Sequence, residues 1–565
     1  MTVQTAPHDM IASAPVARRD RHLAALLPAI VIAALAVLPI AIVIGIALTG
    51  SGEDWPHLVN NVLPGAAATT LALLAMVAVG TASIGVTCAW LVVAYDFPMR
   101  RILAWALVLP LAVPPYLAAY AFGEFFLFTG PVQTALRALL GFQSARDYWF
   151  PDIRSTTGTA IVLSSVLFPY VYLTVRVVFL MQGRNIADVA RTLGAAPVRV
   201  FFRILLPVAR PAIIAGCALV LMETLNDIGA AEYLGVNTLT IAVFTTWLNR
   251  GSLEGAAQLS TVMLLLVLAL LYAERMARRN QRFHGARATH MKARPPRVRM
   301  EGTQKWFATL AVLFPILSGF GIPAYVFCGY AIRRLEQLAD PALQQAFVTT
   351  VFTAGCTALV TVAIALVLVN ATRLSRTAAV GAVARLSASG YALPGTVLGL
   401  GLLFALTRLD NSVDAFARAH LGFSTGLLLS GTAAAVVIAC TVRFLALAEG
   451  AIRAGLEKLP PHLDEAARSL GQTPTASARR VLFPLLKPAL LTAAVLVFVD
   501  TMKELSATIL LRPFGFSTLA THVYESASRG VVEDGAMAAI LIILTALVPV
   551  VLLSRALMRD ADATM

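Results

Sequence analysis

The sequence is poor in charged residues. Asp, Glu, Lys and Arg make up 13% of the 565 residues, whereas typical soluble domains contain about 25%. A soluble chain of this length needs more charge to cover its surface, so a water-soluble protein is excluded. Hydrophobic residues reach 58% and lie in long runs, and the mean hydropathy is +0.79. This composition predicts an all-α polytopic membrane protein.

Acidic residues and cysteines are also scarce. There are 30 Asp and Glu against 44 Lys and Arg, a net charge of +14. The basic residues lie in short segments between apolar runs, which is typical of residues that set membrane topology. We therefore expect contact with membrane lipid and no nucleic-acid partner. The five cysteines are isolated in or beside apolar runs, without the spacing of a metal or redox site.

Twelve apolar runs are long enough to cross a bilayer. The first run follows Arg18, Arg19 and Arg21 and is too long for the core of a cleaved signal peptide, so we expect it to be retained. The spans are predicted near 24–48, 66–95, 101–127, 155–181, 208–230 and 256–274, and near 306–332, 345–370, 378–407, 424–447, 485–509 and 534–556.

Lys and Arg in the short loops predict the orientation. They mark the N-terminal tail, the loop at Arg100 and Arg101, a segment between the fourth and fifth spans of each half, and the C-terminal tail. We predict a multi-pass protein of the cell inner (plasma) membrane with both termini cytoplasmic. The domains are a first half at 1–274, a basic cytoplasmic linker at 275–305 and a second half at 306–565.

The two halves carry an internal repeat. Ten positions of Asp188–Ala212 are identical to their equivalents in Glu465–Ala489, at a constant offset of 277 residues. Six spans separate equivalent points, so the halves run in the same direction, as a parallel duplication. Val113-Pro114-Pro115 and Leu393-Pro394-Gly395 place a helix break in the third span of each half, either a packing kink or a moving part.

Each repeated segment is predicted to form a helix, a turn and a helix on the cytoplasmic side. Asp188–Leu193 and Glu465–Leu470 form the first helix, and the glycine that follows adopts positive φ. A proline stops the second short helix before the next span. The result is a compact knob led by small residues that can dock on another protein; an amphipathic helix on the inner leaflet is the alternative. The residues assigned to this docking are Asp188, Ala190, Gly194, Pro207, Glu465, Ala466, Ala467, Gly471 and Pro484.

The fifth span of each half carries charged residues, namely Glu223 and Asp227 in the first and Asp500, Lys503 and Glu504 in the second. An i, i+4 spacing places the two acids of a span on one helical face. A central charge costs at least about 2.5–3.5 kcal/mol on insertion scales, so such residues usually face a cavity. Four carboxylates near a two-fold axis suit a hard cation or a polyamine, and these five residues form a candidate translocation pathway. The alternative is ion pairing within the bundle, with Lys503 balancing one acid.

The repeated segments resemble a known family. Glu465-Ala-Ala, then Gly471, then Val481-Leu-Phe-Pro484 is similar to the EAA loop of binding-protein-dependent ABC importer permeases. The first copy, with Asp188-Val-Ala in place of Glu-Ala-Ala, is a variant of the same loop. The resemblance covers the whole chain as two fused halves and implies a type I ABC importer permease fold.

That resemblance also implies partners. The coupling loops, at 186–207 and 463–484, would each seat in an ATP-binding subunit, in all a dimer, and an external binding protein, periplasmic or extracellular, would deliver the solute. The sequence has no G-x-x-x-x-G-K-[ST] phosphate loop, consistent with ATP and Mg²⁺ on that partner. The chain itself is then not an enzyme and binds no cofactor.

A second resemblance concerns the solute. The stretch Asp500–Ala520, with Lys503-Glu-Leu-Ser-Ala-Thr508 and Leu511-Arg-Pro513, resembles ferric-iron uptake permeases, and Glu223–Leu239 is a looser copy. This implies iron(III), which agrees with hard-cation chemistry at the acids. Thiamine, polyamine, phosphonate and sulfate permeases share the architecture and remain alternatives.

Two other classes of protein explain less of the sequence. A twelve-span secondary transporter of the major facilitator type is also built from parallel halves. Its Gly-rich loop is missing, because the loop Tyr95–Arg101 contains no glycine, and it gives no reason for two matching knobs. A membrane scaffold would explain the helices but not the paired acids.

Overall fold

The computed structural model describes residues 16–52, 54–180, 197–279, 297–374, 377–387, 390–391, 393–460 and 462–562. These residues are helical apart from short connections and one two-residue ladder. They form two compact units that do not coincide with the sequence halves. Unit 1 comprises Met1–Leu38, Ala358–Tyr391 and Thr441–Val497, and unit 2 comprises Pro39–Thr357, Ala392–Cys440 and Phe498–Met565.

Ten helices of the described residues are long and apolar enough to cross a membrane, or eleven if one bent pair counts as a span. The twelve predicted spans therefore exceed the number that the structure supports by this test. The ten are Leu27–Thr49, Asp54–Ala94, Thr156–Val178, Phe201–Asn226, Leu253–Ala277, Gln304–Arg333, Pro341–Arg373, Ala433–Glu457, Ala478–Met502 and Val532–Leu552.

The difference lies at the third predicted span of each half. In the first half, Arg100–Ala112 and Pro115–Leu140 meet at an angle of 98°. In the second half, α17 (Ala378–Ser387) and α18 (Gly395–Leu421) are separate helices. Pro114 and Pro394 precede the new helices with extended backbones, since a proline ring prevents the preceding turn from continuing. The helix is thus interrupted at both predicted break sites, and not merely kinked.

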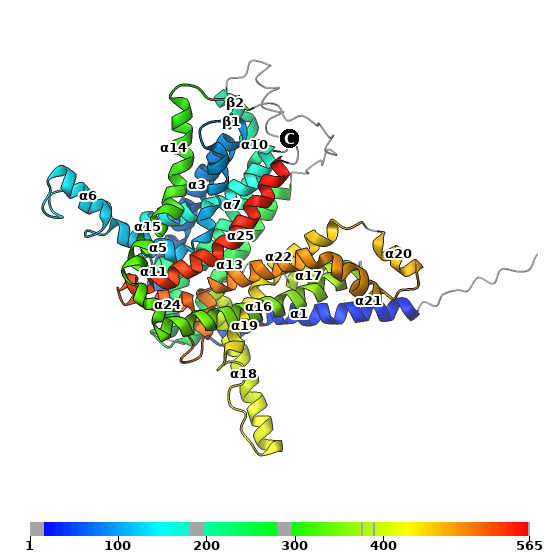
Figure 1. Cartoon of the computed structure of the whole chain (residues 1–565). Coiled ribbons are helices and arrows are strands. Elements are labelled where there is room, and N and C mark those ends of the chain that lie inside the picture. Colours follow the sequence, from blue (N-terminus) through cyan, green and yellow to red (C-terminus); the bar gives the residue numbers. More distant parts are fainter. Residues whose placement is uncertain are drawn as a thin grey trace, which may run out of the picture. The chain divides into compact units, whose positions relative to one another are not determined.

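Unit 2 is built around three helices that pack side by side: α3 (Leu63–Ala94), α7 (Thr156–Val178) and α10 (Leu206–Asn226) (Figure 1). Two helices of the second half, α14 (Gln304–Ile316) and α15 (Ile322–Arg333), pack on first-half elements. Their partners are α3 and α4 (Arg100–Ala106) for α14, and α5 (Pro115–Phe126) for α15. The other helices of this unit that matter below are α6 (Pro131–Leu140), α11 (Gly229–Tyr233), α12 (Leu239–Leu248), α13 (Leu253–Arg279), α23 (Ser506–Leu511), α24 (Leu519–Ser528) and α25 (Ala536–Asp562).

In unit 1, a helix of the first half packs against elements of the second half. Ala29 of α1 (Val16–Thr49) is buried in a cluster with Leu368 of α16 (Pro341–Leu374) and Ala384 of α17. Thr361 donates to the hydroxyl of Thr441, on α19 (Ala433–Glu457), at 3.3 Å. The first helix of each sequence half thus packs against elements of the other half.

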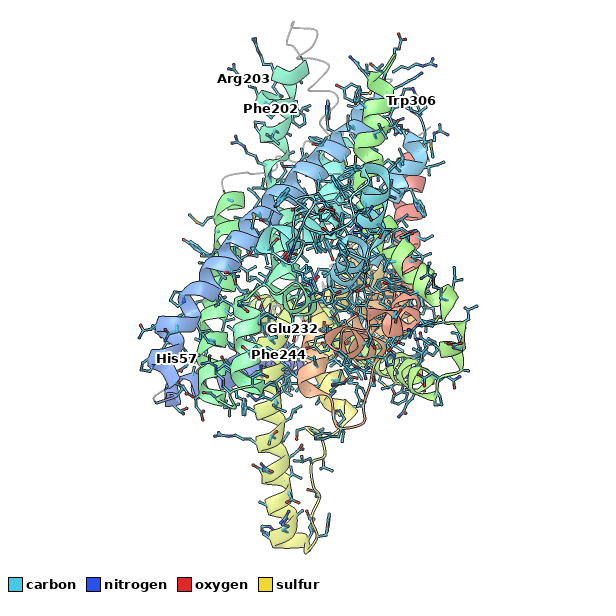
Figure 2. All side chains as sticks on the ribbon, turned by 90° about the vertical axis from the view of Figure 1, so that its left-hand side faces the viewer. His57, Phe202, Arg203, Glu232, Phe244 and Trp306 are labelled. Carbon is cyan, nitrogen blue, oxygen red and sulfur yellow. The ribbon has the colours of Figure 1, made fainter. Side chains whose placement is uncertain are left out.

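One end of unit 2 carries aromatic and basic side chains. Phe202, Arg203 and Trp306 lie at this end in Figure 2, and His57 lies at the other. The ladder of β1 (Tyr95–Asp96) and β2 (Val298–Arg299) belongs to the same end, because Trp90 contacts the rings of both Tyr95 and Phe201. Such residues are typical of a membrane–water interface. The predicted linker meets this end through β2, although its residues 280–296 lie outside the described part.

Four π-helical turns each end two residues before a proline. In a regular helix the proline ring clashes with the carbonyl four residues earlier and lacks the N–H that should bond it. A wider turn accommodates the ring, so the helix continues. The prediction that Pro207 and Pro484 stop a short helix is therefore wrong. The turns are η1 (Leu58–Val62) before Pro64, η4 (Phe201–Leu205) before Pro207, η5 (Leu317–Gly321) before Pro323 and η8 (Ala478–Leu482) before Pro484.

Equivalent hydrogen bonds recur in the two halves of the sequence. The Thr70 hydroxyl accepts from the backbone N–H of Leu239 at 2.9 Å, and the Thr350 hydroxyl accepts from that of Leu519 at 2.8 Å. These N–H groups belong to the first residues of α12 and α24, which have no partner within their own helix. In both halves, the first backbone N–H of the helix is thus satisfied by an equivalent threonine hydroxyl.

Two aspartates near the C-terminal end of α18 accept hydrogen bonds from the segment that follows this helix. Asp410 accepts from the backbone N–H of Ser430 at 2.8 Å. Asp414 accepts from the Ser424 hydroxyl at 2.7 Å and the Thr425 N–H at 2.8 Å, which hold the pKa of Asp414 well below its usual range. These contacts hold the segment that follows α18 against the last turns of the helix.

Candidate functional site

The charged residues of the fifth spans lie where their helices end. Helix α10 ends at Asn226, and Asp227 follows with extended backbone angles (φ −77°, ψ 121°). Helix α22 (Phe483–Met502) likewise ends before Glu504. The two acids of each half are therefore not on one helical face, and that prediction is wrong. The apolar run continues past the break, through Ile228, so hydropathy does not reveal where the helix stops.

The second acid of each pair caps the next short helix. Asp227 Oδ2 accepts from the backbone N–H of Ala230 at 2.8 Å, in the first turn of α11. Glu504 Oε1 accepts from the N–H of Ala507 at 2.8 Å, in the first turn of α23, and Glu504 is buried. Each carboxylate thus satisfies a backbone donor that the new helix leaves without a partner. The same construction occurs in both halves.

The first acids lie beside a lysine. Lys503 Nζ is 2.7 Å from Asp500 Oδ1, and the two side chains are 28% and 23% exposed. Lys503 also interacts electrostatically with Glu223, and all three residues lie near Tyr170 of α7. The expectation that Lys503 balances one acid is confirmed. The structure also brings a charge of the first half close to those of the second.

Asn226 joins the ends of these helices, and the sequence interpretation missed it. Its side-chain oxygen accepts from the Gly395 N–H at 2.6 Å, and its carbonyl accepts from the Ser506 hydroxyl at 2.7 Å. The interrupted third helix of the second half is thereby attached to the end of α10. The available signal was its position, because Asn226 is equivalent to Lys503 at the 277-residue offset.

Tyr116 of α5 lies against the capping acids. It interacts electrostatically with both Glu504 and Asp227. Its side chain is buried, and its hydroxyl has no hydrogen-bond partner among the described residues. A buried hydroxyl without a partner is costly. Tyr116 thus places a polar group near the capping acids of both halves.

The second repeated segment has the first helix and the glycine turn that its sequence predicts, but its second helix continues past Pro484. Helix α20 (Leu463–Ser469) is followed by Gly471 with φ of +80°, and α21 (Pro474–Ser477) then leads through η8 into α22. Leu470 at the turn is 81% exposed. An exposed leucine beside a glycine turn gives this knob an apolar tip. Of the first copy, Asp188, Ala190 and Gly194 lie outside the described residues.

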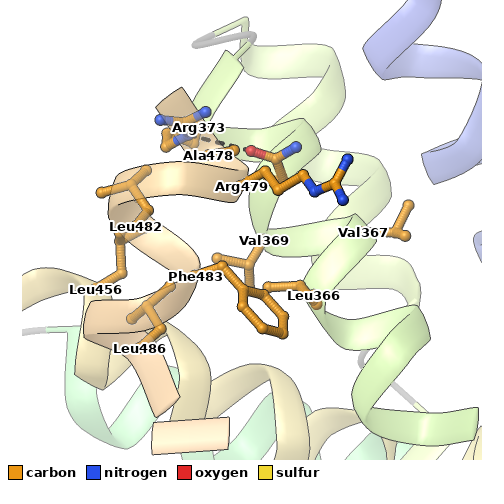
Figure 3. Close-up of a pocket in the computed structure, with 11 residues that line it drawn as sticks. Leu366, Val367, Val369, Arg373, Leu456, Ala478, Arg479, Leu482, Phe483 and Leu486 are labelled. Atoms are coloured by element: carbon orange, nitrogen blue, oxygen red, sulfur yellow. Dashed lines mark hydrogen bonds between the residues drawn. The ribbon is translucent and has the colours of Figure 1, made fainter. Parts of the chain in front are cut away.

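A groove of about 570 Å³ lies in unit 1 beside this knob (Figure 3). Leu366 and Val369 of α16 form one wall, and Leu482 and Phe483 form the other. Arg373 lies at one end, where its Nε donates to Asn370 at 3.2 Å. The helix that follows the knob is thus separated from α16 along an apolar groove.

A duplicated helical bundle, with a charged helix end in each half and a projecting helix–turn–helix, defines a membrane permease subunit. The chain belongs to the family of binding-protein-dependent transport system inner membrane components, whose model matches residues 81–279 and 371–561. It is therefore a non-catalytic, multi-pass inner-membrane component of an ABC importer. The family implies that a binding protein and an ATPase work with it.

The relatives differ in how much of the chain they cover. The Fe(3+)-transport system permease protein FbpB 2 of Haemophilus influenzae is 26% identical over 491 residues, which are 86% of this chain and 88% of that protein. The molybdenum transport system permease protein ModB of Escherichia coli is 29% identical over 201 residues, 34% of this chain and 84% of ModB. The putative 2-aminoethylphosphonate transport system permease protein PhnU of Salmonella choleraesuis is 26% identical over 262 residues, 45% and 90% of the two chains.

Proposed function

We propose that this chain is the permease of an ATP-driven importer of iron(III). The observation that carries the solute assignment is coverage: the iron(III) permease aligns with 86% of this chain, whereas ModB and PhnU align with 34% and 45% of it. The carboxylates at the fifth helices favour a hard cation over an oxyanion such as molybdate or phosphonate.

We place the translocation pathway at the two helix ends. Glu223, Asp500 and Lys503 form one charged group near Tyr170. Asp227 and Glu504 form another near the hydroxyl of Tyr116. Charges in a membrane segment are retained where they meet water or solute. The interrupted backbones support this placement, because irregular structure at membrane depth is tolerated where it lines a cavity.

We assign ATPase coupling to the repeated knobs, with one ATP-binding subunit of a dimer on each. In the second copy these residues are Glu465, Ala466, Ala467, Gly471 and Pro484, and the exposed Leu470 supports docking on a protein surface. Asp188, Ala190, Gly194 and Pro207 have the same role in the first copy. ATP and Mg²⁺ bind the partner, and this chain supplies no cofactor site.

We also propose an orientation of the chain in the membrane. The basic loops place the termini, the linker and both knobs in the cytoplasm. Solute then arrives from an external binding protein on the opposite side of the membrane. The domains remain the two permease halves, 1–274 and 306–565, joined by the linker at 275–305.

The experiment is uptake of radiolabelled ferric iron by a strain that lacks this chain, with and without the wild-type gene. We expect iron uptake to return with the gene, and excess molybdate, sulfate or 2-aminoethylphosphonate not to compete. Uptake no greater than in the strain without the gene would contradict the iron(III) assignment. Competition by one of the anions would transfer the assignment to that solute.

A further inference from the structure

The groove of unit 1 is lined by two helical stripes with the same pattern. Each stripe has the i, i+3, i+4, i+7 spacing of one helical face and an arginine at one end. Figure 3 shows both arginines at the same end of the groove and Leu486 towards the other. The groove therefore has a basic mouth and an apolar interior. The two stripes are Leu366, Val369, Asn370 and Arg373 on α16, and Arg479, Leu482, Phe483 and Leu486 on η8 and α22.

Both arginines lie at the end of a helix that can span the membrane. The span Pro341–Arg373 ends at the first arginine, and the span Ala478–Met502 begins just before Arg479. Each stripe then covers about two helical turns, or about 11 Å. In a bilayer the mouth thus lies at the level of the lipid headgroups, and the interior extends along the hydrocarbon layer.

The groove is a local gap beside α22 and is open to its surroundings. Val367 and Phe483, which line it, are 46% and 43% exposed. Elsewhere α22 packs closely on α19, because a Cβ at Gly455 would lie 2.4 Å from Cβ of Ala489. The volume of about 570 Å³ is within the range of roughly 300–1,000 Å³ for small-molecule sites, which are mostly apolar with few polar groups.

The equivalent space in the first half is filled by aromatic rings. The equivalent threonine hydroxyls of α3 and α16 are 280 residues apart, and at this offset Asn370 corresponds to Trp90. Ala478 corresponds to Phe201 at the offset of 277 residues. Trp90 is buried, and its ring centroid is 6.3 Å from that of Phe201. The second half has an amide and a methyl group in place of this aromatic pair, so the fold alone does not require the groove.

The two arginines of the mouth are also particular to the second half. Arg373 corresponds to Val93, and Arg479 corresponds to Phe202. No acidic side chain is among the described residues that line the groove. The second half thus combines an open apolar interior with two positive charges at its mouth.

We propose that this groove binds an anionic phospholipid, with an acyl chain along the apolar stripes and the phosphate at Arg373 and Arg479. Guanidinium groups bind phosphate oxygens through paired, charge-assisted hydrogen bonds. Basic pockets between membrane helices on the cytoplasmic side are typical sites for such headgroups. An extended peptide fits less well, because its backbone N–H and C=O groups would lack partners on the apolar walls. The choice of the cytoplasmic leaflet rests on the proposed orientation, whereas the binding itself does not depend on the transported solute.

The test is native mass spectrometry of the purified full chain in complex with its ATP-binding subunit, titrated with phosphatidylglycerol or with phosphatidylcholine of the same acyl chains. We expect the wild type to bind phosphatidylglycerol more tightly. Arg373→Gln and Arg479→Gln should each weaken this binding about five-fold, as for one basic residue lost at an anionic membrane surface. Arg480→Gln is the matched control and should bind as the wild type does, because Arg480 donates to Gln472 at 3.4 Å and does not line the groove.

A further variant separates the chain in the groove from the charge at its mouth. Asn370→Trp introduces the residue that the first half has at Trp90, while both arginines remain. The indole ring should fill the interior, so we expect phosphatidylglycerol to bind this variant no more tightly than phosphatidylcholine binds the wild type.

Equal binding of the two lipids by the wild type would overturn the proposal. So would wild-type binding of phosphatidylglycerol by both arginine variants or by Asn370→Trp. Loss of the ATP-binding subunit from the arginine variants, with lipid binding unchanged, would also overturn it, because the arginines would then contact that subunit. Iron uptake tests the function separately: uptake with equal binding of the two lipids refutes only the lipid site, and selective lipid binding without uptake refutes only the solute assignment.

Discussion

At the scale of single residues, the acids at Asp227 and Glu504 have a structural role that their spacing does not reveal. Each accepts a backbone N–H at the start of a short helix. A hydrogen-bond acceptor suffices for that role, whereas attraction of a cation requires the negative charge. The two roles therefore respond differently to the same substitutions.

Asp227→Asn and Asp227→Ala separate these roles. We expect Asn to retain an acceptor and keep the thermal stability of the purified chain close to wild type. Ala leaves the Ala230 N–H without its partner and should cost about 1–3 kcal/mol. If the charge also attracts the solute, Asn loses iron uptake despite its stability. Wild-type uptake in the Asn variant would remove Asp227 from the pathway and leave it as a cap alone.

Individual residues also show how much of the site could be predicted from the sequence. Lys503 beside Asp500 could be predicted, because the two lie only three residues apart in the sequence. Glu124 and Glu232 line one cavity, which could not be predicted, since they are far apart in the sequence and are brought together by the packing of α5 and α11. Asn226 was overlooked because an amide in an apolar run carries no charge.

At the scale of elements, the glycine turn of the second knob was predictable and the helix ends were not. The glycine in the EAA-like segment predicts the left-handed turn at Gly471, which the structure has. The four π turns are not visible in the periodicity, because the long runs around them are apolar on most faces and have no narrow stripe that one extra residue would shift. The breaks after Asn226 and Met502 are not visible in the hydropathy, since apolar residues continue beyond them.

The turn at Gly471 gives an element-scale prediction. A Cβ there would meet no atom within 4 Å, so a substitution is opposed by the backbone at φ of +80° and not by crowding. Gly471→Asn tolerates this conformation, whereas Gly471→Val does not. We expect Val to abolish stimulation of the partner's ATP hydrolysis by the binding protein, and Asn to retain most of it. Equal activity of the two variants would contradict the coupling role of this turn.

At the scale of the whole molecule, the duplication is visible in the sequence but the exchange of helices is not. Composition and the 277-residue offset predict two parallel halves. Nothing in that offset indicates that Ala29 of α1 packs with Leu368 and Ala384 of the second half, or that α14 packs with α3 and α4. Each half therefore lacks buried contacts when the other is absent.

This exchange predicts how a divided chain behaves. We expect residues 306–565 expressed alone to be degraded or to aggregate, because the partners of α14 and α15 are missing. Co-expression with residues 1–305 should restore both the membrane level of the second fragment and iron uptake. Immunoblots of membrane fractions and uptake assays measure the two effects. A stable, monodisperse second half on its own would contradict the importance of these contacts.

The most direct test of the central claim is ATP-dependent uptake of ferric iron by proteoliposomes that contain this chain and its ATP-binding subunit, with the binding protein outside. We predict uptake that requires ATP and the binding protein and is lost in Gly471→Val, and no ATP hydrolysis by this chain alone. Uptake that persists without ATP, or no iron uptake with all components present, would contradict the account.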